Sequence, residues 1–352
     1  MTRIAASVYV WELEKMDKTM PDGLIVITGA AGLIGSQLVS ALHAKGCGLV
    51  GVDFHQPAER GSYFKDIALR EWLRTDALNG WLDAHAGEVA AVIHMGAISD
   101  TTETDAALLD ANNVRFTLDL WERARAHNWR FLYASSAATY GDGAHGFVDS
   151  DDLSDLAKLE PLNLYGWSKH KTDIAILEGI AEGQGAPDVW AGFKFFNVYG
   201  PNEEHKGAMR SLVRKIVPQI QRGEVIRLFR SHRPDYADGA QERDFIYVKD
   251  AIAPVIRALT CDRLSGLFNV GTGEARSFRD LALATFAALG VPATIEYVDM
   301  PENIRNQYQY HTAADTTKAK AHDLHASAYT LEQGVADYVE TLIAGTTEPI
   351  SL

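Results

Sequence analysis

Short apolar runs alternate with stretches of helical periodicity over the first half of the chain. Residues 24–28 (LIVIT) form an apolar run of the length of a buried parallel strand. Residues 33–45 (LIGSQLVSALHAK) carry apolar side chains at helical spacing, and residues 48–53 (GLVGVD) have the character of a second strand. Strand, glycine turn, helix and strand come within about thirty residues, which predicts a βαβ unit.

The alternation continues further along the chain. We expect further strands at 90–94, 130–135 and 188–195, with helices at 105–127 and 164–182. Strands that alternate with helices form parallel sheets covered on both faces, so the pattern predicts an α/β fold with a Rossmann-type doubly wound sheet. Beyond residue 196, loops rich in Gly, Pro and charged residues interrupt the pattern. Patterns typical of strands and helices return around 244–260 and 266–290. These separated segments predict a smaller C-terminal α/β lobe.

Three glycines follow the first predicted strand and open the first predicted helix: Gly29, Gly32 and Gly35. A turn without Cβ atoms lets the backbone approach a pyrophosphate, and the helix N-terminus offers unpaired N–H groups to its charge. The spacing is GxxGxxG rather than GxGxxG, but its place in a βαβ unit predicts a dinucleotide site.

Asp53 ends the second predicted strand, where a carboxylate accepts hydrogen bonds from the adenosine ribose. This arrangement suggests NAD. NADP would need a cation for its 2′-phosphate, and Arg60 and Lys65 follow closely in the sequence. The motif alone therefore leaves the choice between NAD and NADP open.

Tyr165 and Lys169 stand four residues apart in YGWSK, so both side chains lie on one face of a predicted helix. A lysine ammonium near a phenol lowers the phenol's pKa, which is about 10 when unperturbed, and such a tyrosine can accept a proton from a substrate hydroxyl. Ser136 ends a predicted strand at the carboxyl edge of the sheet, where it can bond to the same oxygen. Glycine loop, serine and Tyr-x-x-x-Lys in this order predict hydride-transfer chemistry.

The composition narrows the class of protein. The chain has 352 residues, 47% of them hydrophobic, and a net charge of −14, which argues against binding to nucleic acid or to anionic membranes. Its two cysteines indicate neither a disulfide framework nor a Cys-based metal site, and we expect no metal ligands and a cytoplasmic setting. No apolar run reaches the roughly 18 residues of a membrane span.

The first 22 residues differ in character from the rest of the chain. Glu12, Glu14 and Lys15 interrupt any apolar core, so we interpret 1–22 as an N-terminal extension rather than a signal peptide, with Met20 an alternative start. We expect a dinucleotide-binding domain at 23–196, with returning segments near 250–275 and 306–329. The substrate-binding lobe would then comprise 197–249, 276–305 and 330–352.

Several motifs together resemble the extended short-chain dehydrogenase/reductase family of NAD-dependent epimerases and dehydratases, whose members act mainly on nucleotide sugars. The resemblance covers residues from about 24 to about 340. The stretches that carry it are TGAAGLIGS, IHMGAISDTTETD, NN at 112–113, FLYASSAATYG, PLNLYGWSK, FKFFNVYGPNEEHKGAM, RDFIYVKD, FNVGTGEARSF and QYQYHTAADTTK. SDTTETD and EEHKGAM are the discriminating ones, and they imply epimerisation of an ADP-heptose at C6″.

The resemblance implies a role for each matching position. Tyr165 and Lys206 would be the two acid/base groups, one for each epimer, supported by Lys169 and Ser136. The implied cofactor, NADP, would be held by Gly29, Gly32, Leu33, Ile34, Gly35, Asp53, Phe54, Arg60, Met95, Gly96, Ala97, Ile98, Ser99, Asn112, Tyr165, Lys169, Val198 and Lys206. The ADP-sugar would contact Ser136, Asn197, Ala208, Lys215, Phe229, Arg230, Ser231, His232, Arg243 and Tyr308. The resemblance also implies self-association, as a homopentamer.

The chain departs from the family pattern in several places. Phe54 stands where Asn usually follows the strand-end Asp, Ala208 replaces a serine, Lys215 replaces a histidine, and the segment before Arg243 is longer than expected. These changes concern cofactor preference and the contacts to the ADP-sugar, so NAD stays possible, as does a different nucleotide sugar.

Three other functions remain in competition. Another epimerase of the family, such as a UDP-hexose 4-epimerase, or a nucleotide-sugar reductase would not need a second base in the HKGAM loop. A 4,6-dehydratase is disfavoured, since it would have an acidic pair just after Ser136, where Ala137 and Ala138 stand. The intact Ser136, Tyr165 and Lys169 argue against a non-catalytic scaffold protein.

Overall fold

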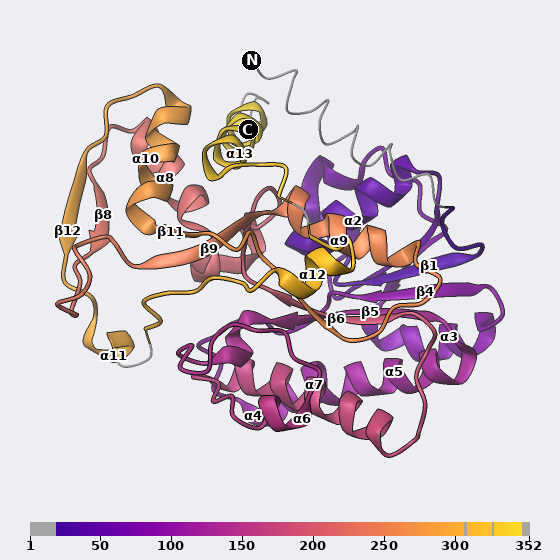
Figure 1. The fold of residues 1–352 in the computed structure, drawn as a ribbon. Coiled ribbons are helices and arrows are strands. Elements are labelled where there is room, and N and C mark those ends of the chain that lie inside the picture. Colours follow the sequence, from indigo (N-terminus) through magenta and orange to yellow (C-terminus); the bar gives the residue numbers. More distant parts are fainter. Residues whose placement is uncertain (1–18, 306–307, 326, 347–352) are drawn as a thin grey trace.

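A seven-stranded sheet runs through the computed structural model, which describes residues 19–305, 308–325 and 327–346 (Figure 1). All neighbouring strands in it are parallel, in the order β10-β6-β5-β4-β1-β2-β3. This confirms the predicted Rossmann-type sheet. The strands are β1 (Leu24–Thr28), β2 (Gly48–Asp53), β3 (Glu71–Arg74), β4 (Val89–His94), β5 (Arg130–Ser136), β6 (Trp190–Phe195) and β10 (Leu267–Val270).

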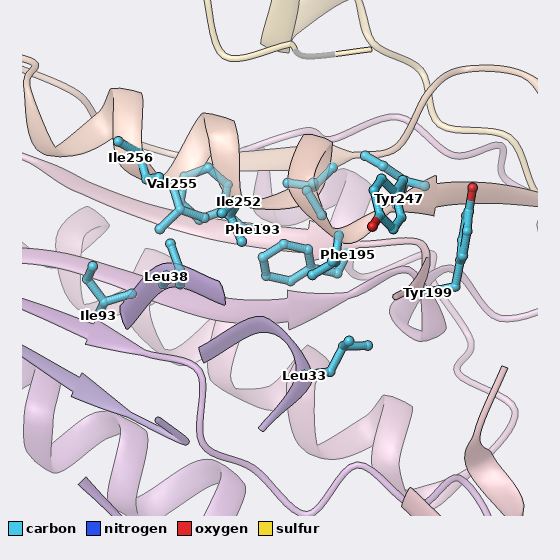
Figure 2. Packing of buried hydrophobic residues seen from close by; sticks show 14 of the residues in the cluster. Leu33, Leu38, Ile93, Phe193, Phe195, Tyr199, Tyr247, Ile252, Val255 and Ile256 are labelled. Atoms are coloured by element: carbon cyan, nitrogen blue, oxygen red, sulfur yellow. The ribbon is translucent and has the colours of Figure 1, made fainter. Parts of the chain in front are cut away.

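Helices cover both faces of this sheet (Figure 1). One face carries α2 (Leu33–Ala44), α9 (Val248–Leu259) and α12 (Thr317–Ala321), and the other carries α3 (Leu78–His85), α5 (Phe116–His127) and α7 (Leu164–Ala181). Each face buries its own apolar cluster. Figure 2 shows Leu38, Phe193 and Val255 packing together in the first cluster, between α2, β6 and α9. The all-apolar strands of the sequence pattern follow from this burial on both sides.

The helix predicted at 105–127 is interrupted. It consists of α4 (Ala106–Leu109), a π-helical turn at Asp110–Arg115 and α5. Asn113, in the middle of the π turn, is buried and bonds to both backbone groups of Ile98. The wider turn directs the Asn113 side chain toward the loop that contains Ile98. The spacing of apolar residues follows a regular helix, so it could not predict this turn.

The remaining elements are two small sheets and further helices. The first small sheet contains β7 (Asn197–Tyr199), β9 (Glu242–Tyr247) and β11 (Ala275–Ser277), and the second contains β8 (Ile226–Phe229) and β12 (Ile295–Val298). The helices are α6 (Leu153–Leu156), α8 (Leu212–Gln221), α10 (Phe278–Leu289), α11 (Glu302–Arg305) and α13 (Leu331–Thr346). The second small sheet lies beside α8 and α10 (Figure 1).

The proposed division into domains stays a prediction. Residues 1–18 of the expected N-terminal extension lie outside the described part of the chain, as do residues 306–307, 326 and 347–352. Among the described helices, none combines the length and apolar character that crossing a bilayer requires.

A buried ion pair joins α7 to β6. Lys194 Nζ lies 2.7 Å from Asp173 Oδ2, and both side chains are almost fully buried. The same carboxylate accepts hydrogen bonds from the hydroxyl groups of Tyr133 at 2.9 Å and Ser135 at 2.7 Å, and Lys194 also donates to Thr139. The network therefore satisfies both charges and fixes α7, the helix of Tyr165 and Lys169, against the sheet.

We predict that Asp173→Ala lowers the free energy of unfolding by about 3–5 kcal/mol, because it leaves the Lys194 ammonium buried without its partner. Urea denaturation followed by circular dichroism measures the change. Glu296→Ala is the matched control, since it breaks the exposed pair with Arg227 and should leave the unfolding curve almost unchanged. Equal stability of the Asp173→Ala variant and the native chain would contradict the prediction.

Candidate active site

A cavity of about 770 Å³ lies at the carboxyl ends of β1, β2, β4, β5 and β6. In open α/β sheets this edge holds ligands where the strand order reverses, here between β1 and β4. The cavity brings together most of the residues selected from the sequence. They are Gly29, Gly32, Leu33, Ile34, Gly35, Asp53, Phe54, Met95, Gly96, Ala97, Ile98, Ser99, Asn112, Ser136, Tyr165, Lys169, Asn197, Val198, Lys206, Arg243 and Tyr308.

The glycine loop needs glycine for reasons that the structure makes explicit. Gly29 has φ +64°, and a Cβ there would lie 2.6 Å from the Gly96 nitrogen. A Cβ on Gly35 would lie 2.0 Å from the Gly29 carbonyl oxygen. Gly32 is the N-cap of α2 and makes no side-chain capping bond, so the first N–H groups of this twelve-residue helix stay available at the cavity. A cradle of this kind fits a pyrophosphate.

Asp53 ends β2 and lines the cavity beside the glycine loop. Its carboxylate accepts N–H bonds from Ala31 in the glycine loop and from His55, both at 3.0 Å. Phe54 is 57% exposed and lines the cavity. Arg60 belongs to the 3-10 helix Pro57–Phe64, and its side chain lies outside the described part of the structure.

The loop after β4 is fixed by a buried polar chain. His94 bonds to the hydroxyl groups of Thr28 at 2.6 Å and Thr117 at 2.9 Å, and the Thr28 hydroxyl also accepts the Gly96 N–H. Asn113 holds Ile98 through both backbone groups of that residue. Burial lowers the pKa of His94 to about 3, with the positive charge of Lys169 acting in the same direction, so the imidazole is neutral.

Ser136, Tyr165 and Lys169 meet at one wall of the cavity. Ser136 ends β5 and caps the following 3-10 helix by accepting the Ala138 N–H at 3.1 Å. Asn163 caps α7 by accepting the Gly166 N–H at 2.8 Å, which places Tyr165 and Lys169 in the first two turns. The alignment of strand end and helix start brings the three side chains together.

The electrostatics of this wall differ from the simple expectation. Burial raises the pKa of Tyr165 above its usual value, and a hydrogen bond with Ser136 partly offsets that rise. Burial also lowers the pKa of Lys169 to about 8, which the Asp173 carboxylate opposes. Desolvation of the phenol is the largest of the effects on Tyr165, so its pKa shifts upward, whereas the sequence predicts a downward shift.

Lys206 approaches the same cavity from a different element. It belongs to the 3-10 helix Glu204–Met209, and His205 and Met209 of that segment also line the cavity. Burial lowers the pKa of Lys206, and the Glu203 carboxylate opposes this shift. A lysine with a lowered pKa exchanges protons closer to neutral pH, as an acid/base group must.

Arg243 gives the cavity a buried positive charge. It is 8% exposed, and none of the ion pairs among the described residues includes it. Its guanidinium lies 5.1 Å from the Tyr308 ring centre and 5.6 Å from that of Phe278, and donates to the Glu242 carbonyl oxygen at 2.7 Å. A buried guanidinium held by aromatic rings and lacking a carboxylate is suited to an anionic ligand.

Six expected substrate contacts do not line the cavity: Ala208, Lys215, Phe229, Arg230, Ser231 and His232. The Phe229 ring lies next to Tyr308, which lines the cavity, and the two ring centres are 6.4 Å apart. Arg230 is exposed and lies within 4 Å of Asp238 and Asp299. Lys215 is exposed as well, although partial desolvation of its ammonium, followed by the positive charges of Arg210 and Lys206, lowers its pKa.

Sequence reasoning missed several residues that build or line the site. Asn113 follows Asn112 in the sequence, and both lie in the π turn. There the Asn113 side chain donates to the Ser168 hydroxyl, whereas the Asn112 side chain donates to the Leu108 carbonyl oxygen. Asn202 donates to the Ala31 carbonyl oxygen at 3.1 Å and to the Ser36 hydroxyl at 2.8 Å, so it ties the later loop to the glycine loop. No pattern within the PNEE stretch singles out Asn202, because its partners lie far away in the chain.

The fold and the glycine cradle define a dinucleotide-binding α/β protein. The model of the NAD dependent epimerase/dehydratase family matches residues 25–271. The chain therefore belongs to this family, and its cofactor is a nicotinamide dinucleotide.

Known proteins of similar sequence and structure agree with this. The chain is 44% identical over 328 residues to ADP-L-glycero-D-manno-heptose-6-epimerase of Nitratidesulfovibrio vulgaris, covering 91% of this chain and 98% of that one. The Helicobacter pylori enzyme of the same name superposes with a TM-score of 0.74 at 26% identity, covering 93% and 98%. MoeE5 in complex with UDP-glucuronic acid and NAD gives a TM-score of 0.73 at 27% identity, covering 92% and 100%. These matches confirm the expected family and an epimerase activity.

We predict that His94 makes the protein sensitive to acid. The folded state keeps His94 neutral down to about pH 3, whereas the unfolded chain protonates it below its ordinary pKa of 6.5. The stability that neutral His94 contributes is therefore fully present above about pH 6.5. As the pH falls below that value, the free energy of unfolding decreases by about 1.4 kcal/mol per pH unit. Urea titrations between pH 6 and 4 should show a shallower decline for His94→Gln than for the native chain. Parallel declines would contradict the assignment.

Proposed function

We propose that this protein is an ADP-L-glycero-D-manno-heptose 6-epimerase that interconverts the D-glycero and L-glycero epimers at C6″. The observation that carries the proposal is the convergence of Tyr165 and Lys206 on one cavity from two different elements. At C6″ the hydroxyl takes a different place in each orientation of the substrate, so the proposal assigns a separate proton-transfer group to each orientation. The names of the relatives support the choice of an ADP-heptose.

The cofactor would lie across the glycine loop, with Asp53 at its ribose and Lys169 near its nicotinamide end. When bound there, the cofactor would supply hydride transfer from C6″ and hydride return to the opposite face. The protein's own residues would hold the nicotinamide and sugar rings in place and transfer protons. Ser136 and Tyr165 would bond to the C6″ oxygen, and Tyr165 would take its proton in one orientation.

Lys206 would serve the other orientation. In its neutral form it accepts the hydroxyl proton of the second epimer, and in its charged form it returns a proton to the ketone oxygen. Lys169 would remain charged and stabilise the negative charge that develops on the Tyr165 oxygen. The pKa of Lys169, lowered to about 8, predicts that this support weakens as the pH rises past that value.

Arg243 would hold the diphosphate of the ADP-sugar. Its planar guanidinium can bind two phosphate oxygens at once, and Tyr308 and Phe278 fix its orientation. The remaining substrate contacts proposed from the sequence, Lys215 and Phe229 among them, would have to move toward the cavity on binding.

The cofactor that we propose is NADP, and one described residue supports it. Arg74 ends β3 directly beside Asp53 of β2. Its Nη1 lies 3.5 Å from the Phe54 carbonyl oxygen, and its side chain is 57% exposed. A guanidinium at this place could bind a 2′-phosphate, which would explain how NADP fits beside the Asp53 carboxylate.

A UDP-hexose 4-epimerase or a nucleotide-sugar reductase is the competing function. Neither needs a lysine in the position of Lys206, and the relatives' names do not favour either. The homopentamer stays a prediction from the resemblance, and the cytoplasmic setting is inferred from the low cysteine content, with Cys47 and Cys261 the two cysteines of the sequence.

Removing both proton-transfer groups should abolish epimerisation. We expect Tyr165→Phe/Lys206→Met to be inactive, while each single variant still oxidises one of the two ADP-heptose epimers in a half-reaction. Single-turnover absorbance at the nicotinamide band measures each half-reaction separately. A double variant that epimerises at the native rate would exclude the two-base mechanism.

Cofactor identity provides an independent test. Denaturing the natively purified protein should release NADP, identified by mass. Arg74→Ala should weaken NADP binding about tenfold, the loss expected for a charge-assisted hydrogen bond, with little effect on NAD. Arg227→Ala, an exposed arginine on β8, is the control and should change neither. Release of NAD, or an equal loss for both cofactors, would overturn the assignment of NADP and Arg74.

A further inference from the structure

Glu203 is a fully buried carboxylate that stands three residues before Lys206. It accepts hydrogen bonds from the Ser211 backbone nitrogen at 2.7 Å, from the Ser211 hydroxyl, and from the Tyr338 hydroxyl at 2.9 Å. Three donors on one carboxylate offset the cost of burying its charge. Neither the cavity nor the family motif explains why an acid is buried here.

The position of these donors matters for Lys206. The backbone nitrogen of Lys206 donates to the Glu203 carbonyl oxygen at 3.0 Å, and Ser211 caps α8 immediately after the loop. Glu203 therefore closes a loop of nine residues by bonding its first residue to its last. Between the two ends, Glu204, His205, Gly207 and Ala208 are exposed, and Gly207 interrupts the 3-10 helix with φ +52°. The bonds of Glu203 thus hold the two ends of the loop together, and Glu204 adds a pair with Arg214 of α8 at 2.7 Å.

Tyr338 extends this arrangement to the C-terminal helix. Its side chain is fully buried in α13, and its hydroxyl is the donor that reaches Glu203 from outside the loop. A second tyrosine, Tyr247 on β9, bonds to the same helix through Asp337 at 2.5 Å, and Lys249 binds that carboxylate at 2.7 Å. Of these two tyrosine–carboxylate contacts of the helix, the one between Tyr338 and Glu203 involves the Lys206 loop.

We propose that Glu203 and Tyr338 are positioning residues that hold Lys206 in place for proton transfer, so that α13 is part of the catalytic arrangement. The inference rests on the proposed function, in which Lys206 serves one of the two epimers. It goes further by assigning a role to a buried acid and to a helix that contribute no side chain to the cavity. Tyr165, held by α7, does not depend on this contact.

The test compares the two half-reactions in the complete protein. Lys206→Met first defines which ADP-heptose epimer needs Lys206 for its oxidation. Tyr338→Phe removes only the hydroxyl, and we expect it to slow oxidation of that epimer about five- to tenfold at saturating substrate, with KM little changed. Oxidation of the other epimer should stay at the native rate. Glu203→Gln, which keeps one acceptor oxygen, should slow the same half-reaction less than Glu203→Ala.

Tyr247→Phe is the matched control, because it removes a hydroxyl bonded to the same helix without touching Glu203. It should leave the ratio of the two half-reaction rates unchanged. The melting temperature of this variant shows how much thermal stability is lost when a contact of α13 is removed without affecting Glu203. If Tyr338→Phe slows both half-reactions equally, or neither, the positioning role is wrong even though Lys206→Met stays selective. If Lys206→Met itself affects both epimers equally, the two-base function fails instead.

Discussion

The site depends on the parallel pairing of seven strands, which brings their carboxyl ends to one edge. Because the strand order reverses between β1 and β4, the loops after these two strands separate and leave room for a ligand. The glycine loop, the Met95–Ser99 loop, Ser136 and the residues after β6 all begin at that edge. The candidate residues of the first half of the chain that line the cavity gain their place from this one arrangement.

Burial then decides the chemistry of the groups that meet there. The same desolvation that raises the pKa of Tyr165 lowers those of Lys169 and Lys206, so the tyrosine holds its proton more tightly and the lysines less. The shifts run in opposite directions, so Lys169, whose pKa falls to about 8, gives up its proton at a lower pH than Tyr165 does. Asp173 and Glu203 oppose the shifts of the lysines, each from a hydrogen-bonded, buried position.

Much of this was predictable from the sequence, and the rest had a physical reason to be hidden. Apolar runs and the glycine spacing identified the sheet, the cradle and Asp53, because those signals are local. Asn113, Asn202 and Glu203 act through contacts with residues distant in the chain, and a polar residue in a helix or loop carries no periodic signal for such contacts. Ser231 and His232 were expected in the cavity from the resemblance, but their backbone nitrogens bond to Asp238 and Tyr310 instead.

The central claim is that C6″ of an ADP-heptose is inverted by transfer and return of the same hydride. Incubation of the purified protein with ADP-D-glycero-D-manno-heptose deuterated at C6″ tests it directly, with the products followed by nuclear magnetic resonance and mass. The account predicts a mixture of both epimers that keeps the deuterium at C6″. Failure to form the second epimer, or replacement of that deuterium by hydrogen from the solvent, would contradict it.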